Sequence, residues 1–278
     1  MEYLFATLTS LIILILGASI GSFVNVVVHR LPANLSILWP PSRCPHCLHR
    51  LGKLENIPIL GWLWLKGRCR HCRNRIPIRY FLIEAITGVL FVSIFWKYGF
   101  VTNIITWQTL GYWAFLSWLL SLCLIDLDTM TLPNSLTQSG LLAGLVFQGI
   151  TGYLSASELS GVSPQLFTGI VGAVLGIWLF EIISFGGSIT FGQAAMGGGD
   201  AKLAAMIGAW LGWKYLLLSG FIATAIGAFA GGGAIALGYL NRRQPIPFGP
   251  FLTLGAGVTV FWGEVILSAY LQLFFPWS

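Results

Sequence analysis

The chain has 278 residues, of which 56% are apolar and only 9% are charged. A soluble globular domain carries roughly 25% charged residues, so the composition excludes an ordinary soluble protein. The formal net charge of +6 could suggest a nucleic-acid partner, but ten of the 15 Lys and Arg residues and all four His lie between His29 and Arg79. We therefore expect no nucleic-acid partner.

The first predicted element is a transmembrane helix at residues 1–28. Residues 3–28 carry no charge, and a helix needs roughly 17–25 apolar residues to cross a bilayer. A secretory signal peptide has a basic start and a shorter apolar stretch. Only Glu2 precedes the apolar stretch here, so the sequence favours a membrane anchor.

Residues 29–80 form the one long polar segment, which is basic and rich in Cys, Pro and Trp. Cytoplasmic loops of membrane proteins carry an excess of Lys and Arg. This loop is therefore predicted to lie in the cytoplasm, with the N-terminus outside. Residues 81–103 would then form a second span and an external loop.

Four cysteines of this loop are arranged as two C-x-x-C pairs. Cys44 and Cys47 form one pair, Cys69 and Cys72 form the other, and 21 residues separate them. Two such pairs can supply four thiolates to a structural zinc ion. Two disulfides or a redox pair are the alternatives, and a cytoplasmic location disfavours disulfides. Cys123 stands alone in an apolar run and is expected to be a packing residue.

Residues 104–278 are predicted to form a membrane-embedded bundle. Backbone polar groups find no partner in lipid, so apolar stretches should be helices. With two weaker candidates at 81–96 and 201–213, the total is about eight transmembrane helices. The clearer candidates after the loop are 104–125, 135–153, 165–180, 215–240 and 248–263.

Ionisable groups inside a membrane are costly and are functional candidates. Two of them have distinctive contexts: Asp126 ends an apolar helix, and Asp200 follows three glycines. Asp126 and Asp128 could instead belong to an interfacial turn, and Asp200 could be a helix N-cap. The full set of candidates is Glu84, Asp126, Asp128, Glu181, Asp200 and Glu264.

Asp126 and Asp200 are 74 positions apart, but the order of the spans predicts both at the cytoplasmic face. Two carboxyl groups that share one proton form the device of aspartic proteases. The glycines before Asp200 would let a substrate backbone approach closely.

Several motifs resemble those of the type IV prepilin peptidases, the bifunctional prepilin leader peptidase/N-methyltransferases, over roughly residues 17–250. Asp126 to Asn134 reads DLDTMTLPN, and Gly197 to Asp200 reads GGGD, the G-x-G-D motif of intramembrane aspartic proteases, which Lys202 continues. The remaining matches are GSFVNVVVHRLP at 21–32, SRCPHC at 42–47, NIPILGWLWLKGRCRHC at 56–72 and RYFLIE at 79–84.

The resemblance implies that Asp126 and Asp200 are the catalytic pair and that Asp128 is secondary. Gly197, Gly198, Gly199 and Lys202 would lie along the approach of the substrate. It further implies cleavage of type IV prepilins or pseudopilins after a Gly at the cytoplasmic face of the inner membrane. The loop would take part in N-methylation of the new N-terminus by S-adenosylmethionine.

Two other classes of protein fit parts of the sequence. A proton-coupled transporter would use intramembrane carboxylates, with Glu181 and Glu264 in support. A non-catalytic assembly factor would present the zinc-bound loop, but it leaves both aspartate motifs unexplained.

Overall fold

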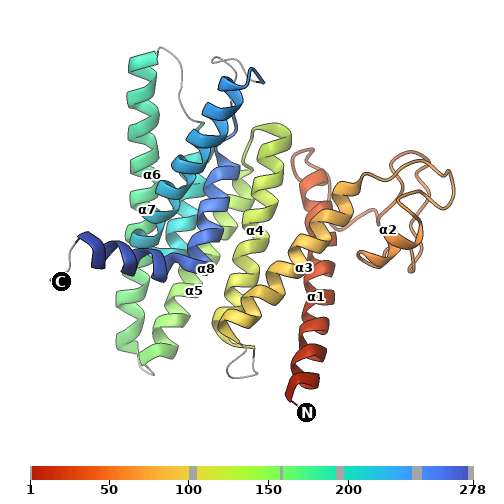
Figure 1. The fold of residues 1–278 in the computed structure, drawn as a ribbon, viewed down its shortest axis with the longest axis horizontal. Helices are drawn as coiled ribbons and strands as arrows, with labels where there is room; N and C mark the ends of the chain where they lie inside the picture. The colour runs from red at the N-terminus through yellow and green to blue at the C-terminus, as the bar shows by residue number, and fades with distance from the viewer. Residues whose placement is uncertain (1, 100–104, 157–158, 192–196, 240–245, 275–278) are drawn as a thin grey trace. The chain divides into compact units, whose positions relative to one another are not determined.

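The computed structural model of the chain describes residues 2–99, 105–156, 159–191, 197–239 and 246–274. Within these ranges it contains eight α-helices and one short 3-10 turn, and its only β-pairing is two isolated bridges (Figure 1). Seven of the helices are long and apolar enough to cross a membrane. The predicted class, an all-α polytopic membrane protein, is therefore confirmed.

The chain divides into two compact units, residues 1–121 and 122–278. The first unit holds α1 (Glu2–Arg30), α2 (Leu60–Trp64), α3 (Ile78–Tyr98) and most of α4 (Trp107–Thr129). In its core, Trp113 stacks on Phe91 with ring centroids 4.9 Å apart, and its indole N–H donates to the Phe91 carbonyl at 2.8 Å. Burial of such aromatic surface stabilises the packing of α4 on α3.

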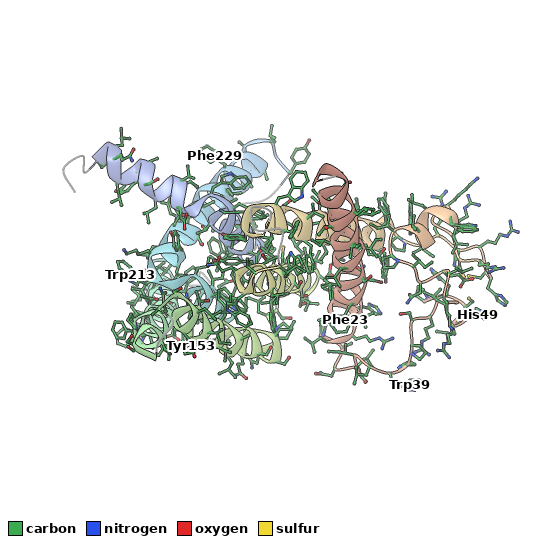
Figure 2. The ribbon with its side chains drawn as sticks, turned by 90° about the horizontal axis from the view of Figure 1, so that it is seen from below. Phe23, Trp39, His49, Tyr153, Trp213 and Phe229 are labelled. Carbon is green, nitrogen blue, oxygen red and sulfur yellow. The ribbon has the colours of Figure 1, made fainter. Side chains whose placement is uncertain are left out.

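The loop from α1 to α3 stands beside these two helices and contains α2 (Figure 1). Its first stretch is held by the guanidinium of Arg30, the last residue of α1. This group donates to the carbonyl oxygens of Ser36, Ile37 and Pro40 at 3.1, 3.4 and 2.6 Å. Trp39, which is 71% exposed, projects from the loop, as does His49 (Figure 2).

The second unit holds the end of α4, then α5 (Asn134–Ala156), α6 (Val162–Phe191), α7 (Gly198–Ala236) and α8 (Gly249–Phe274). Small residues let α6 and the first half of α7 pack backbone to backbone. A methyl group added at Gly172 or Gly208 would collide with the backbone of the other residue. Membrane helices associate through this kind of close packing.

Helix α7 bends sharply at Gly212, whose φ of 78° lies in the left-handed region. Gly227, in the second half, lies next to Phe251 near the start of α8, and Asp200 and Gly249 both lie close to Asp126. A straight helix would separate residues 200 and 227 by roughly 40 Å. The second half of α7 therefore returns toward the end where the helix began (Figure 1).

The sequence predicted 201–213 and 215–240 as separate spans, whereas in the structure they belong to one bent helix. The half before Gly212 has 14 residues and is about 20 Å long, which is short for a bilayer. It is enclosed by protein, since Leu203, Ala204, Met206 and Ile207 are completely buried. Close to the bend, the Gln148 amide donates to the Trp210 carbonyl at 2.9 Å.

Large apolar side chains cover the outside of the helices. Ile12, Phe167 and Phe229 are 66%, 67% and 84% exposed, and Figure 2 labels Phe229 on α7. Lipid is the solvent that such surfaces require, so the chain is a multi-pass membrane protein. The predicted division of the chain into four functional segments stays a prediction.

Candidate active site and metal site

Asp126 lies in the last turn of α4. The helix ends three residues later because Met130 adopts a φ of 51°, and the Met130 N–H donates to the Asp126 carbonyl at 2.8 Å. The Asp126 side chain is only 5% exposed, whereas Asp128 in the same turn is exposed. Asp126 is thus a buried carboxyl group in the last turn of a helix rather than an exposed residue of an interfacial turn.

Asp200 lies in the first turn of α7 and is 8% exposed. The residue that caps this helix is Gly197, and the Asp200 N–H donates to the Gly197 carbonyl at 3.1 Å. No side chain bonds to the cap. The alternative that Asp200 is the N-cap is therefore wrong, and its carboxyl group is free of that role.

Asp126 and Asp200 both lie in the second unit, near enough for the charge on Asp126 to act on the Asp200 carboxyl group. The segments that carry them are fastened together. The Lys202 ammonium donates to the Asn134 amide oxygen at 2.7 Å, and Gly199 lies against the Leu132 side chain. These contacts join the start of α7 to the turn between α4 and α5.

Asp126 Oδ2 is buried and meets no hydrogen-bond partner among the described residues. Buried polar atoms are nearly always paired, so an orphaned carboxylate oxygen indicates a place for water, a shared proton or substrate. Because the Asp200 carboxyl group lies within range of the Asp126 charge, the arrangement suits two acids that hold one proton between them. Chemically this suits hydrolysis of an amide.

The structure adds Gly249, the first residue of α8, to the site. Its backbone N–H lies by the Asp126 carboxyl group, and a methyl group added at Gly249 would stand 2.5 Å from Oδ2. The only signal for Gly249 in the sequence is weak, a Gly-Pro pair at the start of an apolar run. Nothing in that pair indicates which side chain lies opposite.

The remaining predicted residues fall in different places. Among the residues that the structure describes, a Cβ added at Gly198 would meet nothing within 4 Å, and one added at Gly197 would meet only the Gly199 nitrogen, at 4.0 Å. Lys202 is held by Asn134, as described above. Glu181 and Glu264 are exposed on the outer surfaces of α6 and α8, so they do not gather around the aspartates. Glu84 is buried in the first unit, far along the chain from both aspartates.

The four cysteines of the loop come together in the first unit, within 4.8 Å of one another through their sulfur atoms. The Cys44–Cys72 and Cys47–Cys69 sulfur pairs are 3.8 and 3.9 Å apart. Four sulfurs placed about 2.3 Å from a central zinc ion are about 3.8 Å apart. The cluster therefore fits a tetrahedral metal site, and all four thiols are free rather than disulfide-bonded.

Each C-x-x-C pair is built by the same local fold. The Cys44 N–H donates to the His49 carbonyl and the Cys69 N–H to the Asn74 carbonyl, both at 2.9 Å. Isolated β-bridges, Arg43 with Arg50 and Arg68 with Arg75, close the two turns. The pairs thus face each other as two equivalent halves, and the His49 and His71 rings stack 4.3 Å apart beside them.

The surroundings of the thiols favour a thiolate at Cys44. Burial alone would raise the pKa of Cys44, but backbone N–H groups of Cys47 and His46 and the neighbouring thiols lower it to about 7. A lowered thiol pKa assists metal binding, because the thiolate is the ligand.

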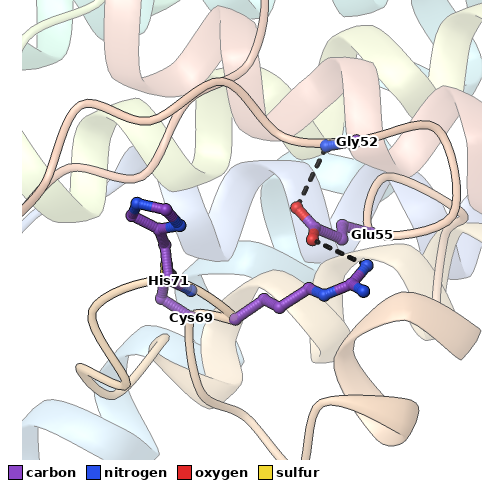
Figure 3. A network of polar contacts seen from close by, with 5 residues as sticks. Gly52, Glu55, Cys69 and His71 are labelled. Carbon is purple, nitrogen blue, oxygen red and sulfur yellow. Dashed lines mark hydrogen bonds and ion pairs between the residues drawn. The ribbon is translucent and has the colours of Figure 1, made fainter.

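The carboxylate of Glu55 links the Cys69–Cys72 pair to another part of the loop. Glu55 accepts the Gly52 N–H at 3.0 Å and pairs with Arg70 at 3.7 Å (Figure 3). Arg70 lies between Cys69 and His71 in sequence, so this contact ties the cysteine cluster to the middle of the loop.

Fold and sites together define a polytopic membrane protein with a paired-carboxylate site and a four-cysteine loop. A profile of the bacterial peptidase A24 N-terminal domain matches residues 15–98, and a profile of the type IV leader peptidase family matches residues 113–232. The chain belongs to the type IV leader peptidase family.

Its curated relatives are named prepilin leader peptidase/N-methyltransferase. The protein of Stutzerimonas stutzeri is 35% identical over 93% of this chain and 92% of its own length. The protein of Aeromonas hydrophila is 36% identical over 95% of this chain and 94% of its own length. The protein of Pseudomonas aeruginosa is 34% identical over 93% of this chain and 92% of its own length. No solved structure matches the chain. The resemblance found in the sequence motifs is confirmed, and the transporter alternative finds no support.

Proposed function

We propose that the protein removes the basic leader peptide from type IV prepilins or pseudopilins and then methylates the new N-terminus. The observation that carries the proteolytic part is the pair of buried carboxyl groups, Asp126 and Asp200, at adjoining helix ends. Relatives that match more than nine tenths of the chain carry both activities in their names.

In the proposed cleavage, Asp126 and Asp200 share one proton. The ionised member takes a proton from water as the water oxygen attacks the scissile carbonyl, while the protonated member donates to the carbonyl oxygen. The proton taken from water then passes to the leaving amine as the C–N bond breaks. The extended backbone before the scissile bond would lie along Gly197 and Gly198, which carry no side chain to obstruct it.

The site is proposed to lie at the cytoplasmic face of the bacterial inner membrane, with the N-terminus outside. The basic composition of the loop supports this orientation. The apolar helix of the prepilin would lie in the lipid against the bundle while its basic leader stays in the cytoplasm. The partners would then be prepilins or pseudopilins of a pilus or a protein secretion system, together with membrane lipid.

The metal of the loop is proposed to be zinc, held by Cys44, Cys47, Cys69 and Cys72. Four thiolates leave no open coordination position, so its role would be structural. A loop of this length has little apolar core, and metal binding would supply much of its folding free energy. For methylation, bound S-adenosylmethionine would supply an electrophilic methyl group to the neutral N-terminal amine.

Mass spectrometry of a prepilin co-expressed with this protein tests both activities at once. The host should lack its own leader peptidase. We expect the prepilin to lose the leader up to its Gly and to gain the mass of one methyl group. A prepilin that keeps its leader would contradict the proposal. A prepilin that is cleaved but not methylated would contradict only the proposed methylation.

A further inference from the structure

The short helix α2 has an outer face of large, exposed apolar side chains. Leu60, Leu63 and Trp64 are 60%, 49% and 80% exposed. The other side of the helix packs inward, where the Trp62 ring lies against Phe81 of α3 with centroids 5.2 Å apart. Exposed tryptophan and leucine next to basic residues are typical of segments that lie at a membrane surface. The outer face of α2 therefore has the composition of a membrane-contacting surface.

The contacts of α2 also fix its height along the spanning helices. The Ile59 N–H, just before α2, donates to Glu84 Oε2 at 2.7 Å. Glu84 is six residues into α3 and therefore about 9 Å from the start of that helix. It touches α1 at Gly21, where an added Cβ would lie 2.8 Å from the Glu84 Cα. Gly21 is nine residues, or about 13 Å, before the end of α1. Helix α2 thus lies beside the ends of the two spans rather than beyond them (Figure 1).

A basic hollow adjoins the outer face of α2. It measures about 550 Å³, and Trp64 and Leu65 form its apolar wall. The rest of its lining, as far as the structure describes it, contains no carboxylate. Lys and Arg donate strong charge-assisted hydrogen bonds to phosphate oxygens, so a phosphate group suits such a hollow. Its remaining lining residues are Lys66, Arg68, Cys69, Arg70 and Arg73.

The fold of the metal site does not require all of these charges. The two C-x-x-C halves have the same local fold and correspond at an offset of 25 residues, the separation of one cysteine pair from the other. At this offset, Lys66 and Arg73 correspond to Pro41 and Leu48. The first half thus builds its cysteine turn without a cation at either position. The additional charge of the second half can therefore serve a partner.

We propose that the outer face of α2 and the basic hollow together dock on the cytoplasmic leaflet of the membrane and bind the headgroup of an anionic phospholipid. Leu63 and Trp64 lie at the level where acyl chains meet headgroups, and Lys66, Arg68 and Arg73 contact the phosphate. The cytoplasmic leaflet is negatively charged and attracts basic segments that flank a spanning helix. The basic leader of a prepilin has the same sign of charge as the hollow and is repelled by it.

The inference rests on the proposed orientation of the loop but not on either enzymatic activity. Native mass spectrometry of the purified full-length protein, titrated with phosphatidylglycerol in a neutral detergent, tests it. Lys66→Gln/Arg73→Gln keeps two long polar side chains but removes both charges. Each cation beside an anionic lipid surface contributes about five-fold to affinity, so the apparent Kd should rise about 25-fold. Phosphatidylcholine, which has no net charge, should bind the wild type more weakly than phosphatidylglycerol does.

The matched control is Arg50→Gln/Lys53→Gln, which removes two exposed charges from another part of the loop. This control should bind phosphatidylglycerol as the wild type does, and both variants should keep the metal content of the wild type. Unchanged binding by Lys66→Gln/Arg73→Gln would overturn the proposal and would point to an acidic protein as the partner of this surface. Equal weakening in the control would also overturn it, because net charge alone would then explain the binding.

If Lys66→Gln/Arg73→Gln loses its metal, cross-linking of a photoactivatable phosphatidylglycerol to the wild-type protein decides instead. The labelled peptides should include residues 60–73, and the label there should fall when phosphatidylcholine replaces the anionic lipid. Labels confined to other residues would contradict the proposal. Neither assay contains a prepilin, so a failure of this inference is distinguishable from a failure of the proposed function.

Discussion

At the scale of single residues, the surroundings of Asp126 explain why the site needs glycine at position 249. The carboxyl group fills the space that a side chain at Gly249 would occupy. Sequence motifs predicted both aspartates, because each stands at the end of an apolar run where a carboxylate is conspicuous. Gly249 was missed because its role is the absence of a side chain opposite a residue more than a hundred positions away.

Replacing Gly249 by Ala should therefore impair cleavage. The new methyl group would push the Asp126 carboxyl group aside, and a misplacement of about 1 Å can lower a rate about 100-fold. The measurement is the initial rate of leader removal in detergent. Gly257→Ala is the control, since a Cβ at that position of the same helix meets nothing within 4 Å; equal rates for the two variants would contradict the geometry.

At the scale of elements, α7 shows where sequence reasoning reaches its limit. The apolar runs on either side of Gly212 can be recognised in the sequence. Hydropathy alone, however, does not predict that the short first half of α7 is enclosed by protein. The bend depends on Gly212, whose φ lies in the left-handed region, and on the Gln148 amide, which donates to the Trp210 carbonyl. Such tertiary hydrogen bonds have no signature in composition.

Gly212→Ala should lower the stability of the second unit. An alanine forced to a φ of 78° costs about 1–2 kcal/mol relative to glycine. Thermal unfolding in detergent should therefore show a lower transition temperature than for Gly220→Ala, a control in the same helix with open space around it. A transition unchanged by Gly212→Ala would mean that α7 does not bend there.

The structure of the cysteine loop, unlike the bend of α7, follows from the spacing of its cysteines. The two C-x-x-C pairs predicted a four-thiolate site, and the sulfur positions fit one. The double variant Cys44→Ser/Cys69→Ser should lose bound zinc, measured by atomic emission on the purified protein. Methylation should weaken because the loop loses its metal, while some cleavage should survive. Full zinc content in this variant would refute the assignment of the ligands.

The zinc site should also respond to pH. Although the Asn74 backbone favours its thiolate, burial and the neighbouring thiols raise the pKa of Cys72 to about 11 in the metal-free loop. Zinc must displace that proton on binding. The apparent zinc affinity should therefore fall as the pH is lowered, and competition with a chelator across a pH series measures this. An affinity that rises toward acid pH would contradict thiolate ligation.

At the scale of the whole molecule, the bend in α7 determines the topology. If α7 crossed the membrane once as a straight rod, the residues before α8 would emerge on the side opposite Asp126. Because α7 doubles back, the start of α8 returns to the side of Asp126, and Gly249 contacts its carboxyl group. The sequence between α7 and α8 contains Arg242 and Arg243, and the positive-inside rule favours the cytoplasmic side for such a basic connection.

Reporter fusions after Tyr239 test this topology. A green fluorescent protein joined there should fluoresce, and alkaline phosphatase should be inactive, because the proposed orientation places both ends of α7 at the cytoplasmic face. A fusion after Lys53 in the basic loop should behave alike. Active phosphatase after Tyr239 would require α7 to be a single straight span.

The account depends most on Asp126 and Asp200 acting as one unit. The decisive measurement is the rate of prepilin cleavage by purified Asp126→Asn, Asp200→Asn and the double variant, with Asp128→Asn as the exposed control. Residues that act together are not additive, so each single variant should lose about as much activity as the double, roughly 10⁴-fold or more. Asp128→Asn should cleave at a normal rate. A single variant of the pair that retains near-normal cleavage, or losses that multiply in the double variant, would contradict the shared-proton site.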